Sequence, residues 1–168
     1  MAAQCIVQRH TIMEYLTALH DSAFSTWIRE AETVWAFPTV LTVHTFGMML
    51  LVGCAWVVDL RLLGIGRTIP IGPLRPLFRM MWFAFWINLA TGVLLFIADP
   101  ERKATSILFW SKMLLIVINL PLIKRLERAV YGNSSAPAVV SGGARQLAAV
   151  SAALWAGTIF AGRLLGYM

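Results

Sequence analysis

Residues 35–58 read WAFPTVLTVHTFGMMLLVGCAWVV, an apolar run that contains no Asp, Glu, Lys or Arg. At a rise of about 1.5 Å per residue, an α-helix of this length extends about 36 Å, more than the hydrocarbon core of a bilayer at about 30 Å. Backbone N–H and C=O groups find no water inside lipid, so a spanning segment has to satisfy them internally as a helix. This stretch therefore predicts a transmembrane helix and an integral membrane protein.

Three further apolar runs have the same character. They cover residues 77–98, 106–123 and 146–167, and the shortest of them is only just long enough to cross a bilayer. The sequence therefore predicts an all-α fold, in which residues 34–168 form a membrane bundle of four transmembrane helices.

The composition of the whole chain agrees with a membrane location. Of its 168 residues, 59% are hydrophobic and 13% are charged, whereas about 25% of residues in soluble domains are charged. The net charge is +6, but the Lys and Arg residues stand beside the apolar runs rather than along one basic stripe. We therefore expect the lipid bilayer as a partner, and no nucleic acid.

Residues 1–33 precede the first apolar run and form a separate N-terminal segment. Four apolar residues recur at helical spacing between positions 13 and 29: Leu16, Leu19, Ala23 and Trp27. This stripe predicts a short interfacial helix that lies on the membrane, with Trp27 at the level of the headgroups. Met13 is an alternative start to Met1, and no segment has the pattern of a cleavable signal peptide.

The basic residues predict the orientation of the chain. Seven of the 14 fall in two connections, 60–76 and 124–145, and Lys and Arg accumulate in loops on the cytoplasmic side. Both termini are therefore expected on the outer side of the membrane.

Small residues that permit close helix packing recur in the last apolar run. They occupy every fourth position: Ala149, Ala153, Gly157 and Ala161. Helices in lipid associate through such close contacts rather than through hydrophobicity. We expect this row to pack within the bundle or between protomers of a homo-oligomer or a larger membrane complex. The alternative is that alanine is simply common in membrane helices.

Among the side chains with ionisable or amide groups in the predicted helices, we single out four: His44, Asn88, Lys112 and Arg163. Such groups are costly at membrane depth, which makes each a candidate for function. With the orientation above, they predict a shared polar pocket that opens outward. Alternatively, Lys112 and Arg163 extend to the headgroups, while Asn88 and His44 bond neighbouring helices, His44 through a backbone carbonyl or a threonine. His44 is also the intramembrane candidate for a metal ligand.

Asp59 and Arg61 mark the end of the first predicted helix. A carboxylate near lipid is stabilised by a partner of opposite charge. We expect a structural ion pair between Asp59 and a basic residue at a neighbouring helix end, Arg79 or Lys124.

Several motifs resemble an uncharacterised bacterial family of small membrane proteins, a domain of unknown function of the DUF6644 type. They are Trp35-Ala36-Phe37-Pro38, His44, Gly47, the string from Asp59 to Gly64, Pro73-Leu74-Arg75, Thr91-Gly92, Lys112, Asn119 and Gly162-Arg163. The resemblance implies a location in the bacterial inner membrane. With the orientation that the basic residues predict, both termini are then expected in the periplasm. Members commonly carry a carboxylate at the position of Leu41 and a histidine near Lys124, and this chain lacks both.

Three functions remain open on these grounds. The first is a non-enzymatic accessory or small-ligand-binding membrane component with the outward pocket as its site. The second is a haem- or copper-binding electron carrier that uses His44, although a bis-histidine haem needs a second intramembrane histidine. The third is a small proton-coupled transporter. The sequence contains no catalytic motif, so enzyme activity and a cofactor are not expected.

Overall fold

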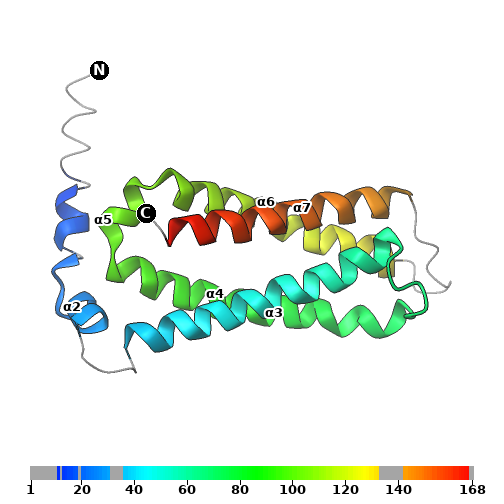
Figure 1. Ribbon diagram of the computed structural model, residues 1–168, viewed down its shortest axis with the longest axis horizontal. Helices are drawn as coiled ribbons and strands as arrows, with labels where there is room; N and C mark the ends of the chain where they lie inside the picture. Colours follow the sequence, from blue (N-terminus) through cyan, green and yellow to red (C-terminus); the bar gives the residue numbers. More distant parts are fainter. Residues whose placement is uncertain (1–10, 12, 19, 31–35, 133–141, 167–168) are drawn as a thin grey trace, which may run out of the picture. The chain divides into compact units, whose positions relative to one another are not determined.

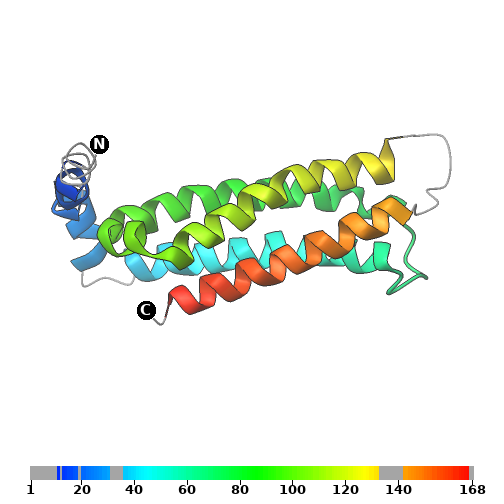
Figure 2. The same cartoon turned by 90° about the horizontal axis from the view of Figure 1, so that it is seen from above.

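The structure is a computed structural model that describes residues 11, 13–18, 20–30, 36–132 and 142–166. Within these residues it contains helices and no strand (Figure 1). Four of the helices are long: α3 (Phe37–Leu63), α4 (Arg75–Ala98), α6 (Ile107–Tyr131) and α7 (Gly142–Leu165). They pack as a four-helix bundle (Figure 2), which confirms the predicted all-α fold.

Each long helix has the length and composition of a membrane span, with the 3₁₀ turn η1 (Gly72–Leu74) extending the second span to Gly72. Large apolar side chains such as Phe46, Phe83 and Phe160 are exposed on these helices. Lipid is the solvent that covers such a surface without cost. The protein is therefore a multi-pass membrane protein.

The helices extend beyond the apolar runs that predict them. α3 continues from 58 to Leu63, α6 continues from 123 to Tyr131, and α7 begins at Gly142 instead of 146. Lys and Arg are good helix formers, and positive charge is favourable near the C-terminal end of a helix. Several basic residues that we expected in the connections therefore lie on the last turns of α3 and α6.

Gly64 ends α3 in a left-handed conformation, with a φ of 103°. Its N–H donates to Arg61 O, and the N–H of Ile65 donates to Leu60 O, which are the two bonds of a Schellman cap. The Arg61 guanidinium then donates to the carbonyl groups of Arg67 and Ile69. These bonds fold the connection around Arg61 before η1 leads into α4.

The contacts divide the chain into two compact units. Unit 1 takes the described residues up to Phe46 together with Ile87–Ser106, and unit 2 takes Gly47–Trp86 and the described residues from Ile107 onward. The largest buried cluster lies in unit 2: Leu51, Val52, Cys54, Ala55, Val58, Leu62, Phe78, Met81, Ala84, Ile123, Leu126, Ala148 and Trp155. Unit 2 therefore contains a continuous hydrophobic core.

Unit 1 holds the N-terminal helical segments. The helix expected over residues 13–29 is interrupted, because a turn at Asp21–Ser22 separates helical residues 13–18 from α2 (Ala23–Glu30). The Ser22 hydroxyl accepts the N–H of Ser25 and so caps α2. Ser25 in turn donates to Ile97 O near the end of α4. The interfacial position of this segment stays a prediction.

A short helix, α5 (Pro100–Thr105), connects α4 to α6 and was not expected from the sequence. Proline is favoured in the first turn of a helix, where its missing N–H leaves no bond unmade. Lys103 on α5 donates to Leu95 O. Burial lowers the pKa of Lys103, while the charge of Asp99 opposes this shift.

Candidate functional site

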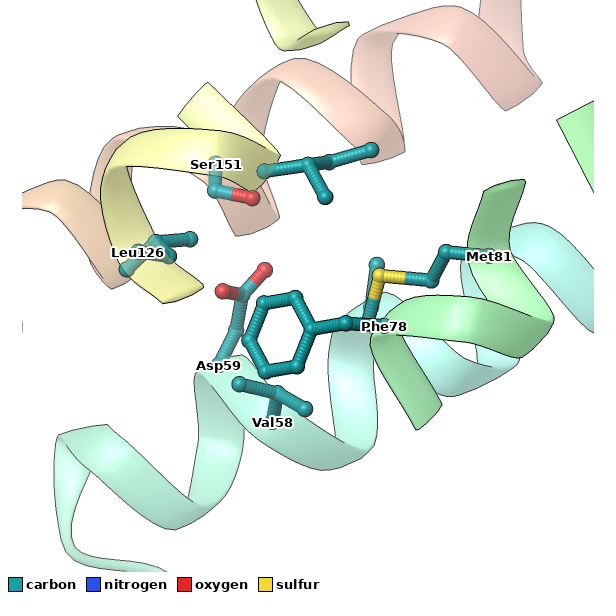
Figure 3. A pocket seen from close by; sticks show the side chains of 8 residues that line it. Val58, Asp59, Phe78, Met81, Leu126 and Ser151 are labelled. Carbon is teal, nitrogen blue, oxygen red and sulfur yellow. The ribbon is translucent and has the colours of Figure 1, made fainter. Parts of the chain in front are cut away.

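Asp59 occupies the last turns of α3 and is buried within unit 2, with an exposed fraction of 1%. It lines a small cavity together with Ala55, Val58, Phe78, Met81, Ile123, Leu126 and Ser151 (Figure 3). Helices α3, α4, α6 and α7 all contribute to this lining. A carboxyl group therefore lies where the four helices of the bundle meet.

Ser151 on α7 is the polar neighbour of the Asp59 carboxyl group. Its hydroxyl points toward the carboxyl oxygens and hydrogen-bonds the group (Figure 3). The second oxygen, Oδ2, is buried and has no hydrogen-bond partner in the described structure. Buried polar atoms are nearly always paired, so an unpaired carboxyl oxygen is an exception that calls for a reason.

The remaining residues that line this cavity are apolar, and none of the residues lining it from α4, α6 and α7 carries a charge. Arg79, the partner expected from the sequence, lines a separate depression with Arg75, Pro76 and Glu127. The structure therefore offers no support for the ion pair of Asp59 with Arg79. Serine is the neighbour in its place.

The volume of the cavity limits what it can hold. It measures about 10 Å³. A water molecule requires a cavity of roughly 10–15 Å³ measured in this way and two to four polar partners. A proton, or at most one water molecule, fits beside Asp59, and an organic ligand does not.

More buried polar groups follow along the contact between α6 and α7, which lie side by side (Figure 1). Lys112 on α6 lies against Gly162, and Leu115 lies against Gly157. The antiparallel register set by these two contacts brings Asn119 to the level of Trp155. Both side chains are fully buried, and Asn119 Oδ1 and Trp155 Nε1 have no hydrogen-bond partner in the described structure.

The row of small residues predicted on α7 is divided between two environments. Ala149 and Ala153 are exposed, Gly157 is half-buried against Leu115, and Ala161 is buried. The face that packs in the bundle consists instead of Ala144, Ala148, Ser151, Trp155, Thr158 and Ala161. A role of Ala149 and Ala153 between protomers stays a prediction.

His44 lies in unit 1, where its Nδ1 atom is 2.9 Å from the Thr91 hydroxyl. A Cβ atom on Gly92 would lie 3.5 Å from His44 Cε1, an ordinary van der Waals distance, so the imidazole ring lies close to α4 at Gly92. The imidazole ring of His44 therefore lies beside Thr91 and Gly92 of α4. This arrangement agrees with the alternative expected from the sequence, in which His44 bonds a threonine of a neighbouring helix.

The four residues of the predicted outward pocket are not brought together within one unit. His44 and the buried Asn88 belong to unit 1, whereas Lys112 and the exposed Arg163 belong to unit 2. The shared pocket therefore stays a prediction. Among the described residues, no three His, Cys, Asp or Glu side chains are grouped as a metal site.

Comparison with known proteins identifies no family for this chain, so the fold alone defines its class. No family model matches the chain, and no curated protein or solved structure matches it at a significant level. The fold defines a multi-pass α-helical membrane protein. The resemblance to the bacterial family of the DUF6644 type rests on the motifs of the sequence alone.

Proposed function

We propose that the protein is a proton-coupled membrane component in which Asp59 binds and releases the proton. One observation carries this proposal: the carboxyl group of Asp59 is buried in a membrane helix, faces a serine hydroxyl, and has an oxygen without a partner among the described residues. Ionisable groups inside a membrane are costly and are found in proton relays and ion pathways.

The neighbour of Asp59 suits both protonation states of a carboxyl group. A serine hydroxyl donates a hydrogen bond to a carboxylate and accepts one from a carboxylic acid. An arginine or lysine partner would instead stabilise the charged form alone. Asp59 can therefore bind and release a proton while the Ser151 hydroxyl group only rotates.

The position of Asp59 along α3 gives protons a short route to it. Asp59 is followed by a single helical turn before Gly64 and the polar connection around Arg61. The cavity is too small for an organic solute, so the proposal concerns the coupling proton only. No contact in the described residues favours the haem or copper carrier over this assignment.

Infrared difference spectroscopy of the protein in liposomes tests proton binding directly. We expect a C=O stretching band of a protonated, buried carboxylic acid that changes with pH and disappears in Asp59→Asn. Asp21→Asn is the matched control, because Asp21 is exposed in the N-terminal segment. A pH-dependent band that persists in Asp59→Asn, or the lack of any such band in the wild type, would contradict the proposal.

A further inference from the structure

A second hollow of unit 2 lies on the surface where α4 begins. It has a volume of about 460 Å³ and is lined by Arg75, Pro76, Arg79 and Glu127. It is far larger than the cavity at Asp59 and falls within the range of small-molecule sites, about 300–1,000 Å³. Both arginines are exposed, so their guanidinium groups are available to a ligand.

The two arginines concentrate positive charge at this place. Arg75 and Arg79 are four residues apart on α4 and therefore lie on the same face of the helix. The N-terminal end of a helix adds a partial positive charge of its own. Glu127 on α6 is the one acidic residue in the lining, so the hollow retains a net positive charge.

The side chain of Arg75 is positioned by an aromatic residue. Its guanidinium lies over the ring of Tyr131 on α6, 5.7 Å from the ring centroid. The Tyr131 hydroxyl donates to Ile71 O at 2.7 Å, and the rings of Phe78 and Tyr131 pack in a T-shaped arrangement. These contacts fix one wall of the hollow in advance, which reduces the entropy lost when a ligand binds.

The residues around the hollow are typical of the level of the lipid headgroups. The apolar run of α4 starts at Leu77, between the two arginines. One turn further on, Lys124 of α6 lies over the ring of Trp82, 5.1 Å from its centroid. Tryptophan and lysine are typical of the interface between lipid and water. A lipid phosphate is therefore the anion present at the height of the hollow.

We propose that this hollow binds the headgroup of a phosphatidylglycerol-type lipid. The planar guanidinium groups of Arg79 and Arg75 donate paired hydrogen bonds to the phosphate. The carboxylate of Glu127 accepts hydrogen bonds from the glycerol hydroxyl groups, which explains an acid inside a phosphate site. Basic hollows between membrane helices bind anionic headgroups in this way.

The test uses the delipidated full-length protein in a neutral detergent and follows thermal unfolding. Added phosphatidylglycerol should raise the unfolding temperature, and phosphatidylcholine with the same acyl chains should not. Inorganic phosphate forms a third arm. Equal stabilisation by phosphatidylcholine would overturn the headgroup site, and equal stabilisation by inorganic phosphate would assign it to the free anion instead.

Variants assign the effect to the hollow. Arg79→Gln should weaken phosphatidylglycerol binding on the order of tenfold, because a charge-assisted contact is lost. Arg145→Gln is the matched control, since Arg145 is an exposed arginine at the start of α7 and does not line the hollow. Should Arg79→Gln not fold, Arg79→Lys keeps the charge and loses the paired geometry, and a smaller loss is expected. Unchanged binding in the folded Arg79 variant would refute the proposal.

Discussion

The imidazole of His44 on α3 donates its Nδ1 proton to the hydroxyl oxygen of Thr91 on α4, across 2.9 Å. The direction follows from the second bond of Thr91, whose hydroxyl proton goes to Ile87 O at 2.8 Å. A hydroxyl has one proton to give, so its oxygen is the acceptor for the ring. In this contact Nδ1 of His44 is therefore the donor and the Thr91 oxygen the acceptor.

Removal of this acceptor should destabilise the protein. Thr91→Val keeps the shape of the side chain but leaves the Nδ1 proton of His44 without the threonine oxygen. We expect the free energy of unfolding to fall by about 1–3 kcal/mol. Denaturation in mixed micelles measures this change.

Gly92→Ala is the matched control on the same turn of α4. The added Cβ would lie 3.5 Å from His44 Cε1, an ordinary contact distance, and alanine favours a helix over glycine by about 1 kcal/mol. Stability should be unchanged or slightly higher. If Thr91→Val were as stable as Gly92→Ala, the His44–Thr91 bond would have no role in the fold.

The second prediction separates two accounts of Asp59. If Asp59 works through Ser151, the effects of Asp59→Asn and Arg79→Gln on the free energy of unfolding should add, because their side chains line separate hollows. An ion pair would instead produce a coupling energy of about 0.5–3 kcal/mol in the double-mutant cycle. Ser151→Ala should couple to Asp59→Asn, and a cycle in which Arg79 couples in its place would favour the ion pair.

The class of fold is predictable from the sequence because it depends on local properties. Four apolar runs of sufficient length define four helices, whatever their neighbours. The helix ends are less predictable, since Lys124, Arg125 and Arg128 are polar enough for a connection and also favourable on the last turns of α6. A hydropathy pattern predicts where the apolar span ends, but the helix itself continues beyond that residue.

The site depends on contacts that hydropathy does not encode. Asp59 is recognisable as an unusual residue from the sequence, but its neighbour Ser151 follows from the packing of α3 against α7. One available signal was the spacing of α7. A row at every fourth residue turns about 40° around the helix with each step. Ala149 and Ala161 therefore face different surroundings, whereas steps of three or four residues follow the buried face from Ala144 to Ala161.

The third prediction uses this division of the α7 row. Gly157→Leu should weaken the packing of α6 on α7, because even a Cβ atom would lie 3.4 Å from Leu115 Cδ1. Ala153→Leu introduces the same side chain on the exposed part of the row and should leave the melting temperature of the monomer unchanged. Size-exclusion chromatography with light scattering adds a second readout. Dissociation of an oligomer by Ala153→Leu would place Ala153 between protomers.

The last prediction concerns the buried amide of Asn119. Its Nδ2 group donates to Leu115 O within the same helix, 3.2 Å away, while Oδ1 is buried and finds no partner in the part of the chain that the structure describes. An unpaired buried acceptor costs about 1–3 kcal/mol, and an apolar side chain of similar size removes that cost. Asn119→Leu should therefore raise the free energy of unfolding by about 1 kcal/mol, measured by denaturation in mixed micelles.

Trp155 provides the comparison for Asn119, since its Nε1 donor is also buried and has no partner within the described ranges. Trp155→Phe removes that donor but leaves part of the indole volume empty, so the two effects oppose each other and the net change should be small. Trp155→Ala creates a much larger void and should cost about 3–5 kcal/mol. A loss of stability in Asn119→Leu would show that the amide makes a favourable contact, because the leucine fills the same space without any polar atom to satisfy.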